Sequence, residues 1–85
     1  MNIYVGNLPF STDDNKLREL FEAHGAVATA TVVADKFTGR SRGFGFVEMD
    51  SADEGRSAIT ALDGKELDGR ELRVSEARPK REFAN

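Results

Sequence analysis

The chain has 85 residues, no cysteine and a formal net charge of −3. This length allows one domain with one small core, and the lack of cysteine excludes disulfides and thiolate metal sites. Because there is a single histidine, His24, we also expect no metal and no cofactor. The negative charge counts against a strong nucleic-acid binder, since affinity for phosphate usually comes with a basic domain.

The first residues contain no recognisable targeting segment. Met1 is followed by a strand-like run, without a basic leader, an apolar stretch of membrane length or a lipidation motif. We therefore expect a cytoplasmic monomer that has no membrane partner.

The N-terminal part predicts a strand followed by a helix. Residues 2 to 6 (NIYVG) alternate and are rich in β-formers, and Pro9 interrupts this run. Ser11 or Thr12 can then cap an amphipathic helix whose apolar stripe ends at Gly25.

The remaining segments predict two strands, a second helix and a last strand. Residues 27 to 34 and 42 to 49 read as strands, joined by a hairpin loop with a Thr-Gly turn signal at 38 and 39. Residues 51 to 64 begin with a Ser-x-x-Glu capping box and stop at a glycine. Residues 70 to 77 (RELRVSEA) alternate again.

The predicted fold class is therefore α+β, with the order β-α-β-β-α-β. Right-handed crossovers convert this order into a ferredoxin-like sandwich, in which a four-stranded antiparallel sheet carries both helices on one face. We expect one domain over residues 1–78 and a short flexible basic C-terminal tail over residues 79–85.

The stretch RGFGFVEM (residues 42 to 49) places two phenylalanines on the same side of a strand. If its valine and methionine face the core, alternation turns Phe44 and Phe46 to the face that no helix covers, and Tyr4 joins them from the first strand. The opposite register would bury charged side chains, because a one-residue slip exchanges the two faces. The two glycines of the stretch would then lie inside, where small residues let a helix approach.

These motifs resemble those of the RNA recognition motif family, and the resemblance covers residues 2 to about 77. RGFGFVEM fits the octamer K/R-G-F/Y-G/A-F-V-x-F/Y at seven positions, and IYVGNL (residues 3 to 8) is similar to the companion hexamer. Met49 departs from the final aromatic position, but it points to the core, where methionine can fill the space. The minimal length is similar to stand-alone single-motif proteins of bacteria, notably cyanobacteria.

The resemblance implies that short single-stranded RNA binds across the open face, with one base on Tyr4 and another on Phe46. Phe44 would pack against sugars and Arg42 would pair with a phosphate. Since stacking is indifferent to the sugar, single-stranded DNA is a further expected partner. The protein would act as an RNA binder or RNA chaperone. Further candidate RNA-binding residues border the face: Lys36, Arg40, Arg73, Ser75, Glu76 and Arg78.

The charge distribution answers the objection raised by the net charge. The two helical segments, residues 13 to 24 and 50 to 63, together sum to −5. The bases of the hairpin loop (36 to 42) and the charged residues of the tail (78 to 82) sum to +5. A positive rim can therefore border the open face of an acidic domain, and we expect a shallow salt dependence.

Two other functions fit the same frame. The sheet face could be occupied by a protein partner, as in some relatives of the family. Small hydrolases such as acylphosphatases also use this frame, but they need an anion-cradling loop with an arginine, which GNLPFST (residues 6 to 12) lacks. We therefore expect a binding domain and not an enzyme, and we assign Asn7 to the turn after the first strand.

Overall fold

The computed structural model describes residues 1–77. Its elements follow the predicted β-α-β-β-α-β order, with one short hairpin added before the last strand. Arg78 and the predicted tail lie outside the described residues. The elements are β1 (Asn2–Gly6), α1 (Asp14–Glu22), β2 (Val27–Ala34), β3 (Ser41–Met49), α2 (Ala52–Leu62), β4 (Glu66–Leu67), β5 (Arg70–Glu71) and β6 (Arg73–Glu76).

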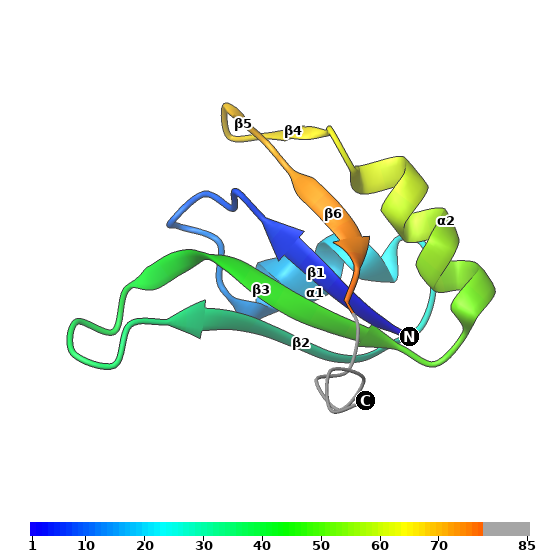
Figure 1. Cartoon of the computed structure of the whole chain (residues 1–85), viewed down its shortest axis with the longest axis horizontal. Helices are drawn as coiled ribbons and strands as arrows, with labels where there is room; N and C mark the ends of the chain where they lie inside the picture. The colour runs from blue at the N-terminus through cyan, green and yellow to red at the C-terminus, as the bar shows by residue number, and fades with distance from the viewer. Residues whose placement is uncertain (78–85) are drawn as a thin grey trace, which may run out of the picture.

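The main sheet has the strand order β2-β3-β1-β6, and every neighbouring pair is antiparallel. Figure 1 shows α1 and α2 packed behind this sheet, with the front left open. Helix α1 packs mainly against β2, and α2 packs mainly against β6. The predicted ferredoxin-like fold is confirmed.

The core lies between the sheet and the two helices. Ile3 and Val5 alternate inward from β1, and Val47 and Met49 do so from β3, so that all four are buried. Burial of an aliphatic or aromatic side chain contributes about 1.5 to 3 kcal/mol relative to exposure. The predicted inner register of both central strands is therefore observed. The helices and flanking segments complete this core with Leu8, Leu17, Phe21, Ala58, Leu62, Leu72 and Val74.

Helix α1 has its N-cap one residue after Thr12 and two after Ser11, the two predicted caps. Its N-cap is Asp13, whose carboxylate accepts a hydrogen bond from the Lys16 N–H at 2.9 Å. Thr12 lies just before this cap; it is buried, and its N–H donates to the Pro9 carbonyl. The expectation of Ser11 or Thr12 as the cap was therefore wrong.

Helix α2 begins at the predicted cap but does not complete the predicted capping box. The Ser51 hydroxyl accepts from the Glu54 N–H at 3.2 Å. The Glu54 carboxylate does not accept from the Ser51 N–H. It accepts instead from the N–H of Ala26, in the turn between α1 and β2, at 3.1 Å. An interaction between distant segments has replaced the local reciprocal bond.

The hairpin of β4 and β5 was not predicted. Asp68 and Gly69 both have positive φ, 50° and 83°, as in the tight turns that Asp-Gly pairs favour. Asn7, itself at φ 57°, donates from its side-chain amide to the Glu71 carbonyl at 2.7 Å. Asn7 thus shapes the turn after β1, as expected, and also anchors the hairpin.

The two glycines of the RGFGFVEM stretch have different roles. Gly45 is buried, and a Cβ there would lie 2.5 Å from the Thr31 carbonyl oxygen and 3.1 Å from Leu17 Cδ2 of α1. Gly43 has φ +84°, and its carbonyl accepts from the Leu8 N–H at 2.8 Å. The predicted close approach of a helix therefore holds for Gly45, whereas Gly43 is required for its backbone conformation.

Replacing Asn7 separates the contribution of its hydrogen bond from that of its backbone conformation. We expect Asn7→Ala to lower the free energy of unfolding by about 2 kcal/mol, because it removes the bond to Glu71 and forces alanine into the left-handed region. Asn7→Gly removes only the bond and should lower it by about 1 kcal/mol or less. Urea denaturation followed by circular dichroism measures both, and equal losses would contradict the backbone contribution.

Candidate nucleic-acid interface

A row of four side chains crosses the open face of the sheet. In the strand register Thr31 of β2 lies opposite Phe46, Phe46 lies opposite Tyr4, and Tyr4 lies opposite Ser75 of β6. Directly opposed residues of antiparallel strands project from the same face. Tyr4 and Phe46 are therefore neighbours on the side that the helices leave open, as alternation predicts.

Three rings on this face form the aromatic platform, which consists of Tyr4, Phe44 and Phe46. Their ring centroids are 5.9 to 6.2 Å apart, and the rings meet in tilted or edge-on geometries. Such contacts stabilise aromatic pairs and hold each ring in place. Phe46 is 42% exposed even so, and it is the most accessible ring of the platform.

Gly6 provides the space for the tyrosine of the platform. A Cβ at this position would lie 2.5 Å from the Tyr4 hydroxyl oxygen and 2.9 Å from two ring carbons. The Tyr4 ring therefore lies over Gly6 along the strand, and any side chain there would displace it. No role for Gly6 was inferred from the sequence, because the direction of the tyrosine ring depends on packing.

The arginine and serine of β6 lie where alternation predicts. Arg73 is opposite Gly6 and Ser75 is opposite Tyr4, and both are exposed. Arg42 is also exposed, and it lines a surface hollow together with two rings of the platform, Tyr4 and Phe44. These polar groups surround the platform with donors suited to phosphate and base edges.

The last predicted residues lie farther from the platform. Lys36 and Arg40 are exposed in the loop between β2 and β3. Glu76 is opposite Ile3, whose side chain is buried, so the Glu76 side chain lies on the helix side of the sheet. The expected role of Glu76 rests on its backbone and stays a prediction, and Arg78 lies outside the described residues.

The β2–β3 loop is ordered by the carboxylate of Asp35. This carboxylate accepts hydrogen bonds from the N–H groups of Phe37 at 2.7 Å and Thr38 at 3.1 Å. These two bonds, in that order, hold the pKa of Asp35 below its usual value, and the positive charge of Arg42 adds to the effect. Lys36 is thereby held in a defined turn.

The open face of β2 carries residues that were not identified from the sequence. Thr29 is opposite Glu48 and Thr31 is opposite Phe46, so both threonines border the platform row. The register shifts by one residue between Val27 and Thr29. The alternation of threonines in VATATVVA was the available signal, but the shift hides which face they occupy.

Within residues 1–77, no group of three or more histidine, aspartate or glutamate side chains could hold a metal ion. None of the helices described is long and apolar enough to cross a membrane.

The fold and this face define a ferredoxin-like domain with aromatic residues on an uncovered sheet. A family model described as the RNA recognition motif matches residues 3–73, and the chain belongs to that family. The family consists of binding domains, which confirms the expectation that the chain is not an enzyme.

Relatives and solved structures agree with this assignment. The chain is 57% identical over 83 residues to the 28 kDa ribonucleoprotein, chloroplastic, of Spinacia oleracea, and the match covers 95% of the chain and 36% of the relative. The structure of RNA Binding Protein PG1 superposes with a TM-score of 0.89 at 50% identity, covering 94% of this chain and 99% of that one. A Sxl-lethal protein/RNA complex superposes with a TM-score of 0.87 at 37% identity, covering 92% and 47%.

The relatives contradict the expected cytoplasmic location. The Spinacia oleracea protein is named as chloroplastic, and so are further relatives from Arabidopsis thaliana and Nicotiana sylvestris. The chain spans only about a third of the Spinacia oleracea protein. The prediction relied on the absence of a targeting pattern in the first residues of this chain, and the names of the relatives overturn it.

The carboxyl group of Asp35 should titrate with a midpoint below the usual 3.8 in the folded protein. Because its folded pKa is lowered, the stabilisation of the loop is fully present above the unfolded pKa and is lost as the pH falls through the folded pKa. A carboxyl-detected NMR titration measures the midpoint. Arg42→Ala should leave most of the lowering intact, since the backbone bonds are the larger cause. A wild-type midpoint at or above 3.8 would contradict this account.

Proposed function

We propose that this domain binds short single-stranded RNA across its open sheet face, with one base on Tyr4 and another on Phe46. The observation that carries this proposal is the direct opposition of these two residues, with ring centroids 5.9 Å apart, on the face that neither helix covers. The spinach relative is named a ribonucleoprotein, and one superposed structure is an RNA complex, which supports the same ligand.

The chemistry of the platform suits unpaired bases. Each stacked base contributes about 1 to 3 kcal/mol, with little dependence on base identity. Phe44 is half-buried, with its ring centroid 6.1 Å from Tyr4 and 6.2 Å from Phe46, and it packs against sugars. The exposed Arg42 guanidinium pairs with a phosphate. Because association has its own entropic cost, two stacked bases and one or two phosphates correspond to a dissociation constant on the order of micromolar.

The acidic helices do not oppose this binding. In α1, Glu22 pairs with Arg18, and in α2, Asp53 pairs with Arg56, both on the side away from the platform. Arg42, Arg70 and Arg73 lie on or beside the open face, and Lys36 and Arg40 are exposed in the β2–β3 loop. A backbone of phosphates therefore meets positive charge locally, although the chain as a whole is acidic.

Several narrower statements belong to the same proposal. Single-stranded DNA binds as well, because the platform stacks bases whatever the sugar. The domain acts as a monomer that traps unpaired segments, as an RNA binder or chaperone. The narrower resemblance to stand-alone bacterial proteins of the family stays a prediction, since the relatives reported above are plant proteins named as chloroplastic.

Selection from a random RNA pool tests the proposed function directly. We expect sequences to be enriched, and Phe46→Ala to weaken their binding by about 5- to 150-fold, because one stacked base is lost. Phe46→Tyr keeps the ring and should bind nearly as wild type. Circular dichroism should show an unchanged fold, since Phe46 is partly exposed. Absence of enrichment would refute the proposal, and unchanged affinity of Phe46→Ala would refute the placement of a base on Phe46.

The salt dependence of binding reports how many phosphates are contacted. With two phosphates neutralised, the slope of log affinity against log salt should be about −1.4. Arg42→Ala should reduce its magnitude by about 0.7, because one contact is lost. Arg56→Ala, on α2, is the matched control and should leave the slope unchanged. Anisotropy titrations at several salt concentrations measure these slopes, and equal effects of the two variants would argue against a phosphate contact by Arg42.

A further inference from the structure

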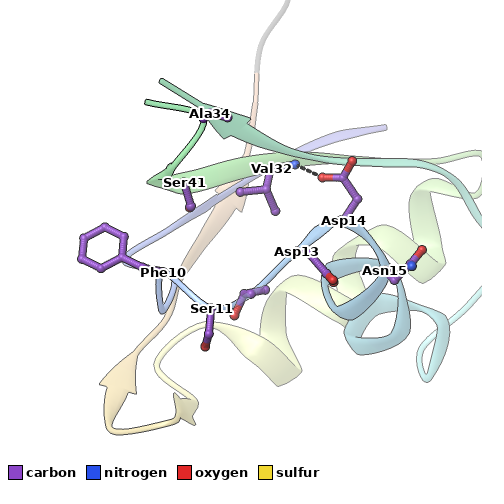
Figure 2. A pocket seen from close by; sticks show the side chains of 10 residues that line it. Phe10, Ser11, Asp13, Asp14, Asn15, Val32, Ala34 and Ser41 are labelled. Carbon is purple, nitrogen blue, oxygen red and sulfur yellow. Dashed lines mark hydrogen bonds between the residues drawn. The ribbon is translucent and has the colours of Figure 1, made fainter. Parts of the chain in front are cut away.

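A second aromatic feature lies beside the platform, in the turn that follows β1. Phe10 is 66% exposed although its neighbours Leu8 and Pro9 are buried. The turn is held by two backbone bonds, from Leu8 N–H to the Gly43 carbonyl at 2.8 Å and from Thr12 N–H to the Pro9 carbonyl at 3.0 Å. In Figure 2 the ring of Phe10 projects away from the other labelled side chains. A fixed backbone thus presents this ring to solvent.

Arg70 lies over the exposed ring. Its guanidinium carbon is 5.2 Å from the centroid of Phe10, a cation–π geometry, although the two residues are far apart in the sequence. The hairpin that carries Arg70 is anchored by the bond from Asn7 to the Glu71 carbonyl. Neither ion pair found within residues 1–77 involves Arg70. An arginine that stacks on a ring retains its N–H groups for an anionic oxygen.

A hollow joins this pair to the platform. Its volume is about 270 Å³, and Tyr4 and Phe44 line it together with Phe10, Arg70 and Arg42. Among residues 1–77, no acidic side chain lines it. A Cβ at the adjacent Gly43 would lie 3.6 Å from the Phe10 ring, so the ring sits directly beside the RGFGFVEM strand. The open face therefore continues, with aromatic and cationic groups, beyond the two proposed stacking positions.

We propose that Phe10 and Arg70 form a site for one further nucleotide of the bound strand. The base stacks on the Phe10–Arg70 pair, and the Arg70 guanidinium donates hydrogen bonds to the phosphate. This inference rests on the proposed binding of single-stranded RNA. It extends the site from the sheet to the β1–α1 turn and the β4–β5 hairpin.

Phe37 shows that exposure alone does not make such a site. It is 97% exposed in the β2–β3 loop, but within residues 1–77 no arginine lies over its ring, and it does not line the hollow beside Phe10. Single exposed apolar side chains are ordinary on protein surfaces. Phe37→Ala is therefore a matched control for the loss of an exposed phenylalanine.

The experiment uses an RNA recovered by selection and shortened one nucleotide at a time to two nucleotides, with affinities measured by fluorescence anisotropy. For the wild type we expect a step in affinity: removal of the nucleotide that reaches Phe10 should weaken binding by about fivefold or more. Phe10→Ala and Arg70→Ala should remove this step and leave the affinity of the two-nucleotide RNA unchanged. Phe10→Tyr, Phe37→Ala and Arg56→Ala should retain it.

The possible outcomes distinguish this inference from the proposed function. If the wild type binds no RNA, or Phe46→Ala binds as well as wild type, the proposed function fails. If Phe46→Ala loses affinity but Phe10→Ala keeps the step, only the additional site is refuted. A loss in Phe10→Ala that is equal at all lengths would also refute it, since the ring would then merely support the platform. An equal loss in Phe37→Ala would attribute the step to exposed apolar surface in general.

Discussion

The antiparallel ladder between β1 and β3 places Tyr4 opposite Phe46, and the rest of the domain depends on this pairing. The two strands are adjacent at the centre of the sheet although a helix and another strand separate them in the sequence. Because side chains alternate between faces, the same ladder that brings the rings together outside also brings Ile3 opposite Val47 inside. The core and the aromatic platform therefore depend on the same strand register, and a slip of one residue would disrupt both.

Two acidic residues at the helices accept hydrogen bonds from the outer strands of the sheet. Asp14 of α1 accepts from the Val32 N–H on the outer strand β2 at 2.7 Å, as Figure 2 shows. Asp63, at the end of α2, accepts from the Val74 N–H on the outer strand β6 at 3.0 Å. Unpaired donors on edge strands invite pairing with other chains. Two carboxylates therefore cover donors on both edges of the sheet, and negative charge is concentrated away from the open face.

Predictions from the sequence were most accurate where the signal was local or periodic. Alternation assigned Tyr4 and Phe46 to the open face, and Ser51 was correctly identified as a helix cap. Two of the errors arose where a distant segment supplies the partner, whereas the cap of α1 was missed although its bond to Lys16 is local. Glu54 contacts Ala26 instead of completing its own capping box, and the conformation of Gly43 is associated with a bond from the β1–α1 turn.

The sequence by itself determined the order of elements, the inner and outer faces of the two central strands and the family to which the chain belongs. These depend on residue periodicity and on motifs that are contiguous in the chain. Only the tertiary structure decided that Gly6 underlies the Tyr4 ring and that Phe10 meets Arg70 beside the platform. These contacts depend on the orientation of the rings and on the bond by which Asn7 anchors the β4–β5 hairpin. Neither can be recognised from a short stretch of sequence, because both are set by packing between distant segments.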